Sequence, residues 1–164
     1  MEIKIALNDH KYRYDFYQMF NIYFALDELK FVDDGEYIIN IEENKITFAF
    51  NGYYKESLIG ENIKEDIKRL VFESLKDITG EEHPWGILVG IRPSKIALKY
   101  LNEGKSNEEI VEIFKEKHLA AREKAELCIE VAKAEESFVN TDEKKIAIYV
   151  GMAFCPTRCF YCSF

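Results

Sequence analysis

The sequence has no apolar run of about 18 residues, the length that a membrane-spanning helix needs. Its first residues, Met1-Glu2-Ile3-Lys4, lack the long apolar stretch of a signal peptide. Basic residues are outnumbered, since 22 Lys and Arg stand against 30 Asp and Glu and give a net charge of -8. Binding to phosphate backbones needs a surplus of cations, which argues against nucleic acid as a partner. We therefore expect a cytoplasmic protein with neither a membrane nor a nucleic-acid partner.

Cysteine is also scarce. Only four cysteines are present, and three of them, Cys155, Cys159 and Cys162, fall near the end of the chain. In a reducing cytosol such clustering indicates a metal or redox role rather than structural disulfides. The fourth, Cys128, shares a helical stripe with alanines, and we expect it to be a buried, inert thiol.

What the sequence does have is apolar material, because 48% of its 164 residues are hydrophobic and 14% are aromatic. This is enough for one well-formed core and the start of a second domain. Alternation predicts a strand over residues 3–7, and helical spacing of aromatic side chains predicts one helix over residues 10–29. Residues 37–41 and 45–50 read as a hairpin. Residues 51–54 are expected to continue its second strand.

Four helices are predicted next. The first covers residues 62–78 and is closed by Gly80, and the second covers residues 92–101. A Ser-x-x-Glu capping box at Ser106 begins the third, and the fourth covers residues 119–138. A polar linker then leads to a lone strand over residues 146–150, which cannot form a sheet by itself. We therefore predict an α+β domain over residues 1–140 and a separate, incomplete unit over residues 145–164.

The cysteine spacing is Cys-x3-Cys-x2-Cys. Three thiolates on one short loop can hold three irons of a [4Fe–4S] cluster and leave the fourth iron open for a substrate or cofactor, whereas ferredoxin clusters have all four irons ligated. The alternative is structural zinc, which takes four ligands. The fourth would have to come from His83, His118 or Cys128.

With Tyr161 just before the third cysteine, this loop resembles that of the radical S-adenosylmethionine superfamily. The resemblance implies that Cys155, Cys159 and Cys162 bind a [4Fe–4S] cluster whose open iron binds S-adenosyl-L-methionine. It implies that Tyr161 lies beside the adenine, with Phe160 also at the cofactor. Residues 146–150 would be the first strand of that family's (β/α) barrel, with the loop at its carboxyl end. The remaining barrel is absent, so we expect the chain alone to be inactive.

A narrower resemblance rests on residues 149–159 and on residues 85–95, which begin Trp85-Gly86-Ile87-Leu88. Both are similar to the oxygen-independent coproporphyrinogen III oxidases, and within these to the HemZ-type coproporphyrinogen dehydrogenases. That implies oxidative decarboxylation of coproporphyrinogen III to protoporphyrinogen IX in haem biosynthesis, with flavodoxin or ferredoxin as low-potential electron donor. The chain departs from the better-known branch at Gly151-Met152-Ala153 and at Ser163. Two alternatives stay open: another radical S-adenosylmethionine enzyme, haem chaperone-like or methyl-transferring, and a non-catalytic metal-binding or interaction module.

Arg92 and Lys95 are candidate contacts for substrate carboxylates, because a guanidinium matches a carboxylate and a porphyrinogen carries several. The alternative is an ordinary solvated helix start. His83 lies in a loop before Pro84 and is a weaker functional candidate, while His10 and His118 are expected at the surface.

Overall fold

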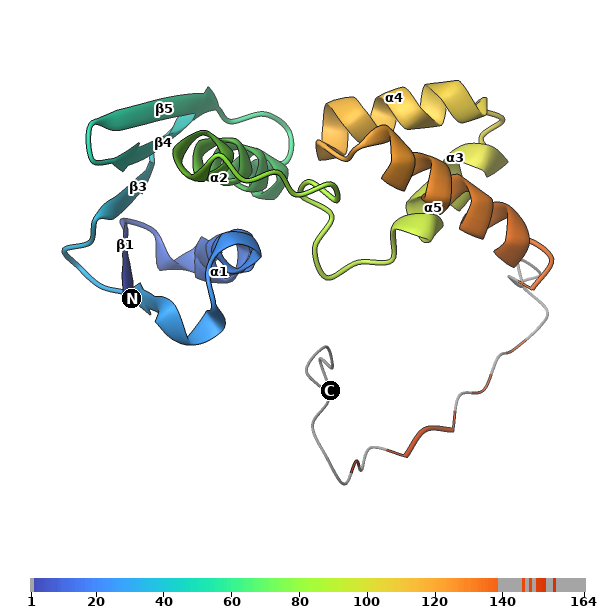
Figure 1. The fold of residues 1–164 in the computed structure, drawn as a ribbon, viewed down its shortest axis with the longest axis horizontal. Helices are drawn as coiled ribbons and strands as arrows, with labels where there is room; N and C mark the ends of the chain where they lie inside the picture. The colour runs from blue at the N-terminus through green and yellow to red at the C-terminus, as the bar shows by residue number, and fades with distance from the viewer. Residues whose placement is uncertain (1, 139–145, 147, 149, 153–154, 156–164) are drawn as a thin grey trace.

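A computed structural model of the chain describes residues 2–138, 146, 148, 150–152 and 155. Within these, two lobes lie side by side and are joined by an irregular segment (Figure 1). The sheet lobe, residues 2–79, holds all the described strands, and the helical lobe, residues 93–138, holds three helices. This composition confirms the predicted α+β class. None of the described helices is both long and apolar enough to cross a membrane.

The sheet lobe is built on a mixed sheet in the order β2-β1-β3-β4-β5. β1 is parallel to both of its neighbours, whereas β3, β4 and β5 run antiparallel to one another in turn. Ile3 and Ile5 of β1 are buried and Lys4 between them is exposed, which is the alternation of a half-buried strand. The strands are β1 (Ile3–Leu7), β2 (Leu29–Phe31), β3 (Tyr37–Ile41), β4 (Lys45–Phe50) and β5 (Tyr53–Leu58).

The chain crosses β1 between β2 and β3, and Gly35 makes this crossing feasible. β2 pairs with β1 up to Ile5, and β3 pairs with β1 from Ile5 onward on the opposite side. Residues 32–36 therefore pass close to the backbone of β1. A Cβ atom on Gly35 would lie 2.7 Å from the backbone nitrogen of Ala6, closer than real Cβ contacts come. Glycine, which has no Cβ, removes this clash.

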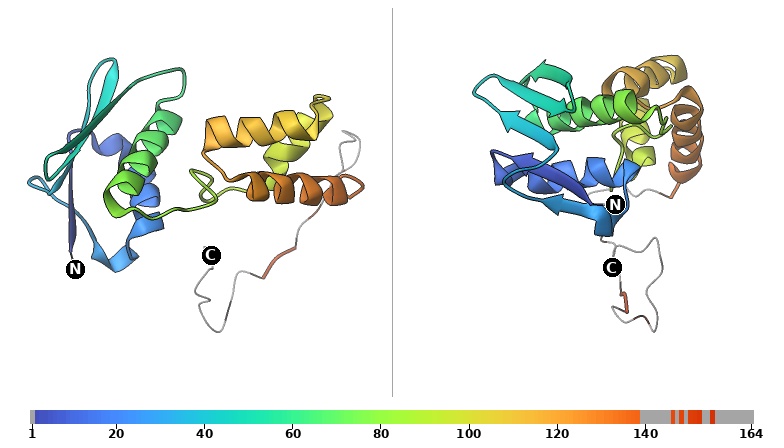
Figure 2. Two further views of the ribbon diagram at one scale, coloured as in Figure 1. Left: turned by 45° about the horizontal axis from the view of Figure 1, so that its top comes forward. Right: turned by 60° about the vertical axis from the view of Figure 1, so that its left-hand side comes forward.

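Two helices, α1 (Arg13–Tyr23) and α2 (Ile63–Thr79), cover one face of the sheet, and no described element covers the other, bare face (Figure 2). The core between them is aromatic. Phe20 meets Tyr37 edge to face, with ring centroids 5.2 Å apart. Gly80 ends α2 with a left-handed φ of 72°, as its position in the sequence predicts.

The helical lobe consists of α3 (Pro93–Asn102), α4 (Asn107–His118) and α5 (Arg122–Glu135), packed around its own core. The predicted capping box is confirmed. The backbone N–H of Ser106 donates to the Glu109 carboxylate at 2.7 Å, and the Glu109 N–H donates to Ser106 Oγ at 3.3 Å. These two bonds satisfy donors that the first turn of α4 would otherwise leave unpaired.

The single helix predicted over residues 10–29 is wrong at both ends. It is replaced by the 3-10 turn η1 (His10–Tyr12), α1, a second 3-10 turn η2 (Leu26–Glu28) and β2. The backbone becomes extended at Phe24, and Leu29–Phe31 pairs with β1 instead of continuing the helix. Pairing between distant segments overrides local helical spacing here.

Two other boundaries differ from the prediction. Residues 51–54 do not continue β4, because Asn51 and Gly52 have positive φ angles of 44° and 84° and reverse the chain into β5. Asn-Gly is the preferred pair for such a two-residue hairpin turn. The last helix begins at Arg122 rather than at Leu119, because Leu119 takes a left-handed φ of 55° and ends α4.

Candidate functional site

The segment that joins the lobes places consecutive side chains in two different cores. Ile87 is buried in the core of the sheet lobe, and Leu88 is buried in that of the helical lobe. Gly86, just before them, has a φ of 56°, and a Cβ there would lie 2.5 Å from the carbonyl carbon of Leu119. The Ile87 N–H also donates to the carbonyl of His118 at 3.0 Å. Part of the Trp85–Lys95 segment therefore has a structural role: it forms the joint that connects the two lobes.

Arg69 of α2 ties the sheet lobe to the end of α4. Its guanidinium donates to the carbonyls of Glu116 and Lys117, the latter at 3.1 Å. Carbonyls in the last turn of a helix have no partner within the helix and lie at the negative end of its dipole. The Arg69 guanidinium therefore supplies hydrogen bonds to these carbonyls, and its positive charge suits the negative end of the dipole.

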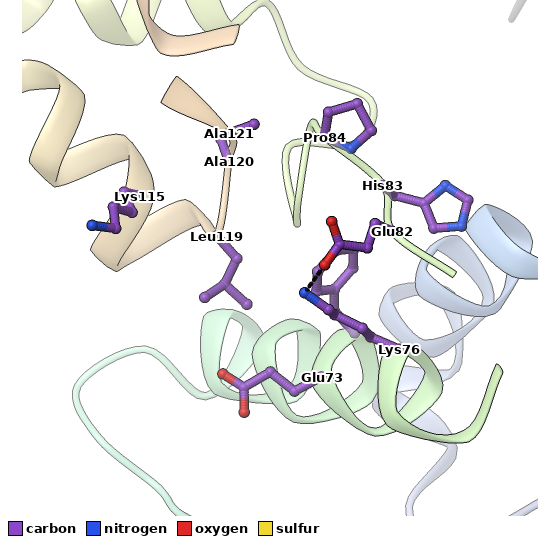
Figure 3. Close-up of a pocket in the computed structure, with 10 residues that line it drawn as sticks. Glu73, Lys76, Glu82, His83, Pro84, Lys115, Leu119, Ala120 and Ala121 are labelled. Atoms are coloured by element: carbon purple, nitrogen blue, oxygen red, sulfur yellow. Dashed lines mark ion pairs between the residues drawn. The ribbon is translucent and has the colours of Figure 1, made fainter. Parts of the chain in front are cut away.

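A pocket of about 550 Å³ opens at the same junction (Figure 3). Its walls come from α2, the loop at residues 82–84, the end of α4 and the connection to α5. The ammonium of Lys76 pairs with the carboxylate of Glu82 at 2.7 Å, and this contact lowers the pKa of Glu82. Glu73 is in turn paired with Lys55 at 3.0 Å. Because these charges neutralise one another, the pocket favours neither an anionic nor a cationic ligand.

His83 lines this pocket as a packing residue. Its ring and that of Tyr23 pack in a T-shaped arrangement with centroids 4.5 Å apart, and its Nε2 lies 3.5 Å from the carboxylate of Glu81. Sequence reasoning missed the pocket because its walls come from four segments that no local pattern links. The run Glu81-Glu82-His83 has neither helical nor strand periodicity that could have pointed to it.

The prediction that His118 lies at the surface is wrong. The side chain is half-buried against Phe114, with ring centroids 5.6 Å apart, and burial lowers the pKa of its imidazole. Cys128 is 3% exposed, as expected, and burial raises the pKa of its thiol. A buried thiol that resists ionisation is a poor metal ligand.

Arg92 and Lys95 lie together at the start of α3, with both side chains exposed. Arg92 is the N-cap of α3 with an extended backbone, and Lys95 lies in the first turn of the helix. Within the described part of the chain, neither side chain forms a hydrogen bond or an ion pair. The positive end of the helix dipole adds to their charge. The structure thus places both predicted residues at the start of α3 as exposed cations without a partner among the described residues.

Cys155 is the one residue of the Cys155–Cys162 loop whose exposure can be described, and it is exposed. Cys159, Phe160, Tyr161 and Cys162 lie outside the described residues. In the strand predicted over 146–150, the described residues Ile146, Ile148 and Val150 are 84–91% exposed and belong to no helix or strand. Among all described residues, no three His, Cys, Asp or Glu side chains gather into a potential metal site. The cluster and the barrel strand stay predictions.

Comparison with known proteins gives a relative but no structural template. No protein-family profile and no solved structure match the chain. The chain is 35% identical, over 105 residues, to the oxygen-independent coproporphyrinogen-III oxidase-like protein HemZ of Bacillus subtilis (strain 168). The matched stretch is 62% of this chain but only 21% of that protein, about a fifth of its length. The chain is therefore similar to one stretch of a coproporphyrinogen-III oxidase-like protein and spans about a fifth of that protein's length.

Proposed function

We propose that the chain is the N-terminal part of a radical S-adenosylmethionine enzyme that decarboxylates coproporphyrinogen III oxidatively to protoporphyrinogen IX in haem biosynthesis. The observation that carries this proposal is the Cys155-x3-Cys159-x2-Cys162 loop in a relative of a coproporphyrinogen-III oxidase-like protein. The name of that relative supports the substrate class. The activity is proposed for the whole protein, of which this chain would be an inactive part.

The three cysteines would hold a [4Fe–4S] cluster, and Tyr161 and Phe160 would lie beside S-adenosyl-L-methionine. Cys155 suits this role, since it is exposed and accessible to iron, whereas the fourth cysteine, Cys128, is buried. When bound, the cluster and S-adenosyl-L-methionine supply a radical that removes hydrogen from the substrate. A low-potential donor such as flavodoxin or ferredoxin would deliver the electron.

Arg92 and Lys95 would bind propionate groups of the porphyrinogen. Both are exposed, unpaired within the described chain and placed at a helix start, where a carboxylate is favoured. The planar guanidinium can form two parallel hydrogen bonds to one carboxylate, and the ammonium can neutralise a second.

Anaerobic reconstitution of the full-length protein with iron and sulfide tests the cluster. We expect four irons per chain, a brown air-sensitive chromophore, loss of both in Cys155→Ala, and retention of both in Cys128→Ala. One zinc per chain and no iron would contradict the proposal and favour the alternative, a non-catalytic metal-binding module. Turnover of coproporphyrinogen III by the reconstituted protein then separates the proposed enzyme from other radical S-adenosylmethionine enzymes.

A further inference from the structure

Helix α5 is apolar on two opposite faces. One face packs into the helical-lobe core through Ala125, Cys128, Ile129 and Ala132. The other, which we call the outer stripe, consists of Leu127, Val131, Ala134 and, in the turn after the helix, Phe138. These four residues follow one another at steps of four, three and four, which aligns them along one side of a helix.

The outer stripe is exposed. Leu127, Val131 and Phe138 are 44%, 37% and 86% exposed. Figures 1 and 2 show α5 at the outside of the helical lobe, with no other described element over it. The neighbouring helix α4 differs, because its exposed side chains beyond Asn107 are all charged: Glu108, Glu109, Lys115, Glu116 and Lys117. A row of large apolar side chains at helical spacing is typical of a surface that another element covers.

The chain itself limits what can cover this row. From Phe138 to Ile146, the start of the proposed barrel strand, there are eight residue steps, which span at most about 29 Å when fully extended. The barrel must therefore begin close to the carboxyl end of α5. Ile146, Ile148, Val150 and Met152 are 84–92% exposed, so these apolar side chains also have no cover among the described residues.

We infer that the outer stripe is the docking surface for the catalytic barrel that begins at Ile146, an inference that rests on the proposed function. The matched stretch is about a fifth of the Bacillus subtilis relative, so that protein has ample chain to supply such a barrel. Docking would bury Leu127, Val131 and Phe138 together with the first turns of the barrel. The start of α3, which carries Arg92 and Lys95, lies next to the carboxyl end of α5, since Ser94 Oγ donates to Glu135 at 3.2 Å.

The test compares hydroxyl-radical footprints of the 164-residue chain and of the full-length protein. We expect Leu127 and Phe138 to be oxidised severalfold more slowly in the full-length protein, and Leu58, 74% exposed on the bare face of the sheet, to be unchanged. Equal oxidation of the outer stripe in both proteins would overturn the inference. Slower oxidation in the short chain at high concentration would do so too, by showing a second copy as the occupant.

A variant pair completes the test in the full-length protein. Leu127→Lys with Val131→Lys should keep the iron content and speed cleavage between residues 138 and 146 by about tenfold, as a population of undocked protein does. Tyr54→Lys with Leu58→Lys on the sheet is the matched control and should leave cleavage unchanged. Unchanged cleavage in the α5 variant with a full complement of iron would refute the docking inference but not the proposed function. Absence of iron in the unmutated protein would refute the proposed function.

Discussion

At Gly86 the backbone has a φ of 56°, and the carbonyl of His118 lies where a side chain would begin. Alanine would pay about 1–2 kcal/mol for the left-handed backbone. Overpacking against Leu119 and His118 adds about 1–3 kcal/mol. We therefore expect Gly86→Ala to lower the free energy of unfolding by about 2–5 kcal/mol, measured by urea denaturation.

Gly52 provides the matched control, since its φ is 84° but nothing lies within 4 Å of the position of a Cβ. Gly52→Ala should lose only the backbone contribution, about 1–2 kcal/mol. Equal losses in the two variants would show that the contact with the end of α4 has no energetic weight.

His118 gives the stability of the chain a pH dependence. Burial lowers the pKa of its imidazole, an effect that nearby Lys117 and Arg69 reinforce and Glu65 opposes. The unfolded chain, with a histidine pKa of about 6.5, then binds more protons than the folded chain below that pH. The free energy of unfolding should fall as the pH drops below about 6.5. Urea midpoints at several pH values should show a flatter dependence in His118→Gln, and an identical slope would refute this assignment.

Arg92 and Lys95 are tested by the double change to glutamine in the full-length protein. If they bind propionates, KM for coproporphyrinogen III should rise at least about a hundredfold, because each of the two lost bonds to a charged group contributes about 1.5–3 kcal/mol. The kcat should change little, since we propose that both residues hold propionates other than the two that are decarboxylated. Lys99→Gln is the control on the same helix, where Lys99 is already paired with Glu103. An unchanged KM in the double variant excludes the carboxylate contact.

Among the elements, local signals predicted the helices with distinct ends. Ser106 begins α4 and Gly80 ends α2 where the sequence places them. The same reasoning could not detect pairing between distant segments, so β2 was missed: the predicted helix ran to Leu29, the first residue of the strand that pairs with β1. The turn at Asn51-Gly52 did have a local signal, the preferred hairpin pair, which sequence analysis passed over.

The cap of α4 can be measured directly. Ser106→Ala removes the acceptor for the Glu109 N–H, and we expect a loss of about 1 kcal/mol in the free energy of unfolding. Ser106→Thr keeps a hydroxyl at the cap and should lose clearly less. If both variants lose the same amount, the capping hydroxyl contributes nothing.

For the molecule as a whole, the sequence indicates a cysteine loop, which stays a prediction, and an exposed helix start with Arg92 and Lys95, but it did not indicate the joint between the lobes. A loop motif is read from spacing alone. The joint depends on Ile87 and Leu88 entering different cores, and nothing in two adjacent aliphatic residues reveals that separation. The pocket at the joint has the same origin, because it exists only once α2 and the end of α4 have come together.

The two cores also predict how the chain unfolds. No described helix or strand of one lobe packs extensively along an element of the other, so the joint and Arg69 provide most of the coupling. Ile87→Ala and Leu88→Ala should each cost about 2–5 kcal/mol, but in different lobes. Hydrogen exchange should show faster opening of the sheet lobe in the first variant and of α3–α5 in the second, as separate cooperative units do. If either change speeds exchange equally in both lobes, the joint couples them into one unit, and a barrel docked on α5 would then stabilise the sheet as well.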